Sequence, residues 1–203
     1  MLGFRLYLVT DRRLVDDLPR AVERALSALP RGAAAVQLRE KDLSARALYE
    51  LGLRLREVTA RYGAPLLVND RADVARAIGA DGLHLPGSGF EVADARAVLG
   101  EGALVGASGH GIDELARRTG ADFATFSPVF PSPGKGPAVG TGALSEAARA
   151  AGMPLFALGG VDAERVPEVL RAGAWGVAAI RAWLQGDPAL STARLWEGIE
   201  KVL

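Results

Sequence analysis

The sequence lacks cysteine, long hydrophobic runs and an excess of charge of either sign. Without cysteine there can be no disulfide, thiolate nucleophile or cysteine-ligated metal, which fits a reducing compartment. The 24 basic and 24 acidic residues cancel and are scattered, so no basic stripe favours nucleic acid or an anionic membrane. No apolar stretch reaches the roughly 18 residues of a membrane span, and the opening MLGFRLYLVTDRR is charged too early for a signal peptide. We therefore expect a cytoplasmic protein that binds neither nucleic acid nor membrane.

The 203 residues, 49% of them hydrophobic, are enough for one domain with a sizeable core, and no linker-like segment divides them. Short apolar runs alternate with longer segments whose apolar residues recur at helical spacing. The predicted strands are Phe4–Thr10, Ala34–Arg39, Pro65–Asn69, Gly82–Leu85, Leu104–Ser108, Phe123–Ser127, Pro154–Leu158 and Gly176–Ile180. The predicted helices are Leu18–Ala28, Ser44–Tyr62, Ala72–Gly79, Val92–Leu99, Ile112–Thr119, Leu144–Ala151, Ala163–Ala172 and Pro188–Val202.

Glycine recurs at the point where a predicted helix gives way to a strand. Gly79, Gly120 and Gly173 each open a similar phrase, Gly-Ala-Asp or Gly-Ala-Trp, as helix C-termini often do. Eight strand-helix units with uninterrupted apolar strands match a closed parallel barrel, whose strands are buried on both faces. We expect an α/β fold, a single (β/α)8 TIM barrel spanning residues 1–203. An open doubly wound sheet is the alternative if the count is wrong by one unit.

Polar residues at the C-terminal ends of the strands are the candidates for chemistry in such a barrel. Gln37, Arg39 and Lys41 are spaced by two, so they point to one side of an extended segment leaving the second strand. Two cations and an amide there suit an anionic ligand. The alternative is a solvated cluster, Arg39-Glu40-Lys41-Asp42, in which the charges neutralise one another.

Asn69 and Asp70 end the third strand, where a carboxylate can hold Mg²⁺ together with phosphate oxygens and waters. The alternative role for Asp70 is an N-cap for the helix that follows. His84 lies between two leucines and is either a core histidine or part of the site, and His110 follows the fifth strand. Neither histidine has a second histidine or a cysteine nearby, which argues against zinc.

Gly159-Gly160 after the seventh strand, together with Arg181 at the end of the eighth, form the expected phosphate site. Backbone N–H groups exposed by glycine and aimed by helix N-termini bind phosphate, although ordinary turn chemistry would also explain a Gly-Gly pair. The longest irregular segment, Pro128–Gly142, follows the sixth strand and carries Lys135. Its Gly, Pro and Ser content is typical of a substrate loop.

Six motifs in this order cover nearly the whole chain: YLVTD (Tyr7–Asp11), VQLREKD (Val36–Asp42), LLVNDRADVARAIGADGLHLP (Leu66–Pro86), GASGH (Gly106–His110), SPVFPSPGK (Ser127–Lys135) and ALGGV (Ala157–Val161). Together they resemble the thiamine phosphate synthase family, which includes TenI-like paralogues. The resemblance implies a transferase that condenses hydroxymethylpyrimidine diphosphate with thiazole phosphate, giving thiamine phosphate and pyrophosphate. Its partners would be these small phosphorylated substrates.

The resemblance also implies roles for individual residues. The diphosphate would be bound by Arg39, Lys41, Asn69 and Lys135. Gln37 and Ser108 would seat the pyrimidine and the leaving group, Asp70 would coordinate Mg²⁺, and Gly159 and Gly160 would hold the thiazole phosphate. We also expect His84, His110 and Arg181 among the substrate-binding residues. Spreading the charge of the departing pyrophosphate over cations and metal is the main electrostatic demand of such a reaction.

Three departures from the synthase pattern keep other activities open. Gly89 stands where synthases have a second Mg²⁺-binding aspartate, so we expect a weakened metal site. Arg181 replaces a serine of the thiazole phosphate site, and Pro128 stands where the TenI-like thiazole tautomerase has its histidine base. The alternatives are a tautomerase that uses another base, such as His110, and a non-catalytic paralogue that only binds thiazole or thiamine phosphate.

Trp175, Trp183 and Trp196 lie late in the chain and either cover an interface or pack the last helices. A homo-oligomer is therefore also left open.

Overall fold

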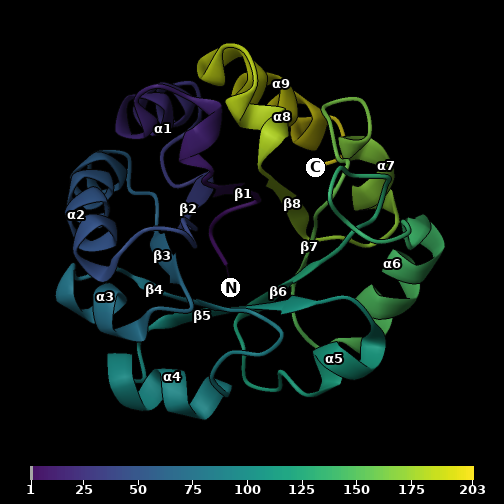
Figure 1. The fold of residues 1–203 in the computed structure, drawn as a ribbon. Helices are drawn as coiled ribbons and strands as arrows, with labels where there is room; N and C mark the ends of the chain where they lie inside the picture. Colours follow the sequence, from purple (N-terminus) through teal and green to yellow (C-terminus); the bar gives the residue numbers. More distant parts are fainter. Residues whose placement is uncertain (1) are drawn as a thin grey trace.

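The computed structural model describes residues 2–203 and contains a closed barrel of eight parallel strands in sequence order. Each strand pairs with the next, and β8 closes the ring by pairing with β1 through Leu6–Val177 and Leu8–Ala179. Figure 1 looks along the barrel, with the strands in the middle and the helices around them. The strands are β1 (Leu6–Val9), β2 (Ala34–Leu38), β3 (Leu66–Asn69), β4 (Gly82–Leu85), β5 (Leu104–Gly109), β6 (Phe123–Phe126), β7 (Leu155–Ala157) and β8 (Gly176–Ala179).

The helices follow the strands and form the outer ring of Figure 1. They are η1 (Arg12–Leu14, a 3-10 helix), α1 (Leu18–Ser27), α2 (Ala45–Arg61), α3 (Ala72–Ala77), α4 (Val92–Leu99), α5 (Ile112–Ala116), α6 (Gly140–Ala150), α7 (Val166–Arg171), α8 (Arg181–Leu184) and α9 (Pro188–Glu200). The expected (β/α)8 architecture is confirmed, and the open-sheet alternative is wrong because the ring closes. None of the helices within residues 2–203 is both long and apolar enough to cross a membrane.

Alternation along each strand divides the core into two parts. Leu6 and Leu8 of β1 belong to the large cluster that packs the strands against the helices, whereas Tyr7 and Val9 point into the barrel. Because both faces are buried, the strands read in the sequence as continuous apolar runs. This is why the predicted strands agree with the observed ones to within one or two residues at each end.

Aromatic rings fill the N-terminal end of the barrel interior. Phe4, Tyr7, Phe123 and Phe156 are all at most 2% exposed, and Phe123 meets Tyr7 and Phe156 edge to face, with ring centroids 5.1 and 5.3 Å apart. The interior is thereby plugged at this end. Polar inward positions, such as Gln37 and Thr125, lie farther along the strands, toward the C-terminal end.

Several helical segments differ from prediction: α5 ends three residues earlier and α7 begins three residues later than predicted, and three others differ more. Helix α6 begins at Gly140, four residues before the predicted start at Leu144, because Val139 and Gly140 donate backbone hydrogen bonds to the carbonyls of Pro128 and Val129. These contacts hold a glycine-rich segment in a helix that its local propensity disfavours. The short helices η1 and α8 were not predicted, since three or four residues carry no periodicity to detect.

The late tryptophans pack within the chain. Trp183 is fully buried and donates its indole N–H to the Val9 carbonyl at 3.0 Å, and the indole of the half-buried Trp175 donates to the Phe4 carbonyl at 3.0 Å. These two side chains tie the end of the chain to β1 and its approach.

Candidate active site

A cavity of about 780 Å³ opens at the C-terminal ends of the strands. All of the predicted site residues except Asp70 line it: Gln37, Arg39, Lys41, Asn69, His84, Ser108, His110, Lys135, Gly159, Gly160 and Arg181. They come from the C-terminal ends of all strands from β2 to β8 or from the loops that follow them. Strand β1 contributes Val9, and the segment after it contributes Asp11 and Arg13. The barrel therefore assembles in one place the polar residues that the sequence spreads over about 145 positions.

The acidic residues beside Arg39 and Lys41 are engaged elsewhere. Glu40 accepts hydrogen bonds from the Arg12 backbone N–H at 3.0 Å and from the Arg12 guanidinium at 3.3 Å, and Asp42 accepts from the same guanidinium at 2.7 Å. The alternative of a self-neutralising cluster at residues 39–42 is therefore wrong. Arg12 takes both carboxylates, and neither Arg39 nor Lys41 has an ion pair within the described residues.

The same carboxylate fixes the backbone that carries Arg39. Glu40 is 2% exposed at its side chain, and its Oε1 accepts a hydrogen bond from the Thr10 hydroxyl at 2.7 Å. Thr10 Oγ1 in turn accepts from the Arg39 backbone N–H at 2.9 Å. The turns after β1 and β2 are thus bound to each other through buried polar atoms, which determines where the Arg39 side chain begins.

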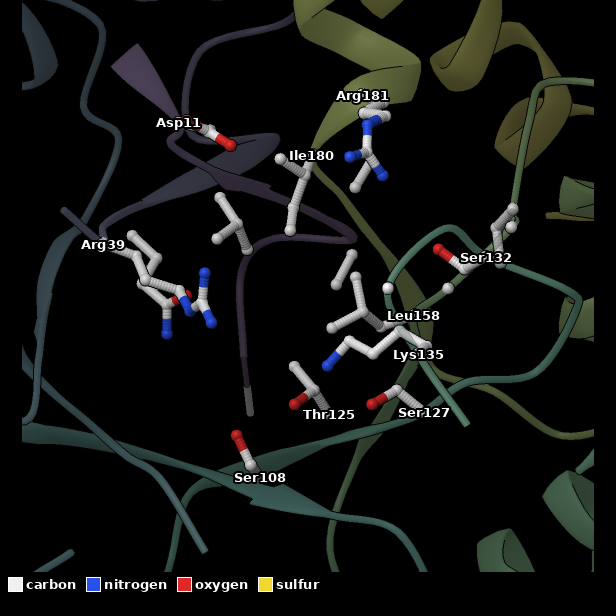
Figure 2. Close-up of a pocket in the computed structure, with 18 of the residues that line it drawn as sticks. Asp11, Arg39, Ser108, Thr125, Ser127, Ser132, Lys135, Leu158, Ile180 and Arg181 are labelled. Atoms are coloured by element: carbon white, nitrogen blue, oxygen red, sulfur yellow. The ribbon is translucent and has the colours of Figure 1, made fainter. Parts of the chain in front are cut away.

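Lys135 enters the cavity from the loop between β6 and α6. In Figure 2 its amino group and the Arg39 guanidinium extend toward the same space from opposite sides. Partial burial, and then the positive charges of Arg39 and Lys41, lower the pKa of Lys135. Within residues 2–203 Lys135 forms no ion pair either. Three cations from two loops are therefore held near one another without a counter-charge.

Asp70 lies at the edge of this cavity instead of in its lining. It is exposed and is the one non-glycine residue with positive φ among those described, at 63°. It does not cap α3, because the N-cap is Arg71 and has no side-chain cap hydrogen bond, so the helix-cap alternative is wrong. Its Oδ1 would lie 3.0 Å from a Cβ built on Gly89. A side chain at position 89 would therefore stand directly beside the Asp70 carboxylate.

The loop that contains Gly89 is held by a buried arginine. Arg118 is 5% exposed and donates to the carbonyls of Pro86 and Gly87 at 2.8 Å and of Phe90 at 3.0 Å. The backbone around position 89 is thus fixed even though the aspartate of the synthase pattern is absent. No group of three or more His, Asp or Glu able to hold a metal occurs within residues 2–203.

His84 belongs to the core and to the site together. It is 3% exposed and points into the barrel, where Nδ1 lies 3.2 Å from the Tyr7 hydroxyl and Nε2 lies 2.9 Å from Ser108 Oγ. Burial, and then the charge of Arg39, lower the pKa of His84 from 6.5 to about 3. The imidazole is therefore neutral near pH 7, and it lines the cavity next to Ser108.

His110 lies on the rim, with its ring against the β6 end. Its Nδ1 lies 2.7 Å from the Ser127 carbonyl oxygen, a contact that requires Nδ1 to carry the proton. In the tautomer with the proton on Nδ1, Nε2 is the acceptor nitrogen of a residue that lines the cavity.

Gly159 and Gly160 have positive φ, 92° and 65°. A Cβ on Gly160 would lie 2.6 Å from the Pro131 carbonyl oxygen, and one on Gly159 would lie 2.8 Å from Pro128 Cα. Both positions thus require glycine for conformation and for the close approach of the β6–α6 loop. Arg165 secures this contact, since it donates to the Gly160 carbonyl at 2.7 Å and lies over the Phe130 ring at 4.7 Å.

Sequence reasoning did not single out several polar residues that line the cavity, among them Arg13, Thr125, Ser132 and Arg165. Thr125 was detectable, because it is two residues from Phe123 on the inward face of β6. Arg165 was not, since it is the N-cap residue of α7 and only its tertiary contacts with Gly160 and Phe130 place it at the cavity. Arg13 pairs with Asp11 at 2.8 Å on the rim.

Comparison with known proteins agrees with this arrangement. The family model described as thiamine monophosphate synthase matches residues 6–183. The chain is 41% identical over 202 residues to the thiamine-phosphate synthase of Salinispora arenicola, covering 96% of this chain and 97% of that protein. It is 36% identical over 207 residues to the thiamine-phosphate synthase of Caldanaerobacter subterraneus, covering 98% and 95%.

Among solved structures, the thiamine phosphate pyrophosphorylase of Pyrococcus furiosus superposes with a TM-score of 0.89 at 32% identity. The match covers 100% of this chain and 98% of that one. With a family model over most of its length and relatives of this identity, the chain belongs to the thiamine monophosphate synthase family.

Proposed function

We propose that this protein is a thiamine-phosphate synthase, a transferase that joins hydroxymethylpyrimidine diphosphate to thiazole phosphate. The bond from the pyrimidine methylene carbon to the diphosphate oxygen breaks, and the thiazole nitrogen forms the new bond to that carbon. Pyrophosphate leaves with the bonding electron pair. The relatives that carry the synthase name over almost their whole length support this reaction.

The observation that carries the proposal is the group of unpaired cations at the cavity. Arg39 and Lys41 have their positive charges free because Arg12 binds the neighbouring carboxylates, and Lys135 forms no ion pair within the described residues. A diphosphate leaving group gains negative charge as its bond to carbon breaks, and preorganised cations stabilise that charge in the transition state. We assign the diphosphate to these three residues with Asn69, and the pyrimidine to Gln37 and Ser108.

Gln37 suits the role of a ligand-binding amide. Its side chain is 2% exposed, and its Nε2 has no hydrogen-bond partner within the described residues. A buried donor without a partner costs free energy, which a ligand acceptor in the cavity would recover. The pyrimidine ring nitrogens supply such an acceptor.

The thiazole phosphate is assigned to the loops after β7 and β8. Gly159, Gly160 and Arg181 all line the cavity, and backbone N–H groups of glycine and a guanidinium are groups that bind phosphate. Arg181 has no ion pair in the described part of the chain, so its charge is available to a phosphate in place of the serine hydroxyl of other family members.

Mg²⁺ is assigned to Asp70, which has an exposed carboxylate beside the cavity. Mg²⁺ commonly takes one or two carboxylates and completes its octahedron with waters and substrate phosphates, so a single aspartate fits such a site weakly. The metal would neutralise diphosphate charge. Mg²⁺ titration of activity tests this assignment: Gly89→Asp, which adds a carboxylate beside Asp70, should lower the Mg²⁺ concentration for half-maximal rate, and Gly87→Asp should not.

The test of the main proposal is direct. Purified protein with both phosphorylated substrates and Mg²⁺ should form thiamine phosphate and pyrophosphate in equal amounts. No product at high metal concentration would rule the synthase out. The tautomerase alternative is not favoured by the names of the relatives; isomerisation of a thiazole carboxylate phosphate that is lost in His110→Ala would revive it.

We further propose that residues 1–203 form a single domain and that the enzyme acts in the cytoplasm. Homo-oligomer formation stays a prediction.

A further inference from the structure

A continuous line of polar groups runs from the closed end of the barrel to the cavity. The Tyr7 hydroxyl lies 3.2 Å from His84 Nδ1, and His84 Nε2 lies 2.9 Å from Ser108 Oγ. Tyr7 is fully buried and His84 nearly so, whereas Ser108 is half-buried and lines the cavity. Figure 2 shows the Ser108 hydroxyl directed into the space between Arg39 and Lys135.

Packing fixes the orientation of the imidazole in this line. A Cβ on Gly106, opposite His84 in the β4–β5 register, would lie 2.8 Å from His84 Nδ1, so glycine there leaves room for the ring and little more. The Tyr7 and Phe123 rings lie 5.6 and 6.2 Å away, centroid to centroid. These close neighbours restrict rotation of the ring.

The protonation states determine the direction of each hydrogen bond. Burial raises the pKa of Tyr7 well above its usual value, so the phenol keeps its proton. His84 is neutral, and a neutral imidazole has one donor and one acceptor nitrogen. Among the described residues His84 Nδ1 is the one side-chain hydrogen-bond partner of the buried phenol, so the phenol proton is assigned to this bond, which leaves the proton of the imidazole on Nε2. Nε2 therefore donates to Ser108 Oγ.

From this geometry, and resting on the proposed function, we propose that Tyr7 and His84 are positioning residues that orient the Ser108 hydroxyl as a hydrogen-bond donor to the pyrimidine diphosphate. When His84 occupies a lone pair of Ser108 Oγ, the hydroxyl proton turns away from the ring and toward the cavity. Without the Tyr7 hydroxyl, the imidazole can carry its proton on Nδ1. The Ser108 hydroxyl would then donate its proton to Nε2 and could not donate it to the ligand.

The chain permits a measurement that does not need turnover. It contains only two histidines, His84 and His110, so a sample labelled with ¹⁵N in histidine gives two sets of ring signals, and His110→Asn identifies the set of His84. Long-range ¹H–¹⁵N spectra distinguish the tautomers. We expect His84 to carry its proton on Nε2 in the wild type and to shift toward Nδ1 in Tyr7→Phe. An Nδ1 proton in the wild type would overturn the proposal.

Kinetics of the full-length enzyme separate positioning from packing. Tyr7→Phe should lower kcat by about 3- to 10-fold, the effect of one hydrogen bond, with the KM for thiazole phosphate unchanged. In a Ser108→Ala background the same change should have no further effect, because the residue being oriented is gone. Phe156→Leu, which perturbs the same aromatic layer without a polar atom, serves as the control and should be additive with Ser108→Ala.

A conservative replacement provides the rescue. His84→Gln keeps an N–H donor near Ser108, so its kcat should exceed that of His84→Leu. Equal activity of these two variants, or additivity of Tyr7→Phe with Ser108→Ala, would contradict the positioning role. If the wild type forms no thiamine phosphate, the proposed function fails, and the tautomer measurement still decides the direction of the hydrogen bonds.

Discussion

At the scale of single residues, positive charge in the cavity is free because no carboxylate within residues 2–203 forms an ion pair with Arg39, Lys41 or Lys135. Lys135 has no carboxylate partner in the described chain, and the nearby cations lower its pKa. A dianionic leaving group would relieve this repulsion on binding. We expect Lys135→Met to lower kcat/KM for the pyrimidine diphosphate by about 10- to 100-fold, the range for a hydrogen bond to a charged group.

Steady-state kinetics checks this prediction, and the chain offers a matched control. Lys201 is an exposed lysine at the end of α9, far along the chain from any cavity-lining residue. Lys201→Met removes the same charge from the molecule and should leave kcat/KM unchanged. A loss of similar size in both variants would mean that net charge, and not the position of Lys135, governs the rate.

The spacing of Gln37, Arg39 and Lys41 predicted that they share one side of an extended segment, and the three do line one cavity. The ion-pair partners of the two acidic residues in this segment, Glu40 and Asp42, could not be predicted. Glu40 and Asp42 pair with Arg12, 28 and 30 residues earlier, and only the barrel brings β1 beside β2. Local sequence shows which charges are available, and tertiary contacts decide which of them are neutralised.

At the scale of elements, the turns after β1 and β2 depend on the buried Glu40 carboxylate. Glu40→Gln removes its charge while Thr10 and Arg12 still present donors. We expect a loss of about 3 kcal/mol in the free energy of unfolding, typical of a broken buried ion pair, and a higher KM for the pyrimidine diphosphate because Arg39 is displaced.

Urea unfolding followed by circular dichroism measures the effect. Asp42→Asn breaks an ion pair with the same arginine, but the Asp42 side chain is 56% exposed. Its cost should be much smaller than that of Glu40→Gln, as for surface ion pairs. If the two variants were equally destabilised, burial of Glu40 would not be the reason for its importance.

The loop after β7 gives a second prediction at this scale. Gly160 and Gly152 have nearly the same φ, 65° and 63°, but a Cβ would meet the Pro131 carbonyl at 2.6 Å only at Gly160. Each glycine-to-alanine change should cost about 1–2 kcal/mol from the backbone alone. Only Gly160→Ala should also raise the KM for thiazole phosphate, since the loop contact breaks. Initial-rate measurements on both variants decide the matter; a rise in both would show that general destabilisation is responsible.

Elements were predictable in proportion to their length and burial. The strands agree closely with prediction because each is an apolar run bounded by glycine, proline or polar residues. Helix α2, with 17 residues and one apolar face, also agrees. By contrast, α8 has four residues and follows β8 directly, so its sequence reads as an extension of the strand. Its position next to the cavity could be found only from the structure.

At the scale of the whole molecule, stability should fall in mild acid because of one buried imidazole. The pKa of His84 in the folded protein is lowered to about 3, so below its usual value of 6.5 the unfolded chain binds the proton first. The contribution is present above pH 6.5 and is lost as the pH falls toward 3, by about 2 kcal/mol between pH 7 and pH 5.

Denaturant unfolding of the wild type and of His84→Gln at both pH values tests this. Ion-paired carboxylates should affect both proteins alike, so the wild type should lose about 2 kcal/mol more than the variant. Equal losses would mean that His84 is protonated in the folded state.

The aromatic rings that fill the N-terminal end of the barrel have a consequence for the order in which the two substrates bind. Phe4, Tyr7, Phe123 and Phe156 fill the N-terminal end of the barrel interior, beneath the residues that line the cavity at the C-terminal ends of the strands. Gln37 and Ser108 lie on strands, deeper than Gly160 and Arg181 on the connections beyond them. A pyrimidine at this depth must then arrive before the thiazole covers it and depart only after the upper position empties. We therefore expect the two substrates to bind in a compulsory order, which product-inhibition kinetics would reveal. Random binding would mean that the loops around the cavity opening move to admit the pyrimidine after the thiazole has bound.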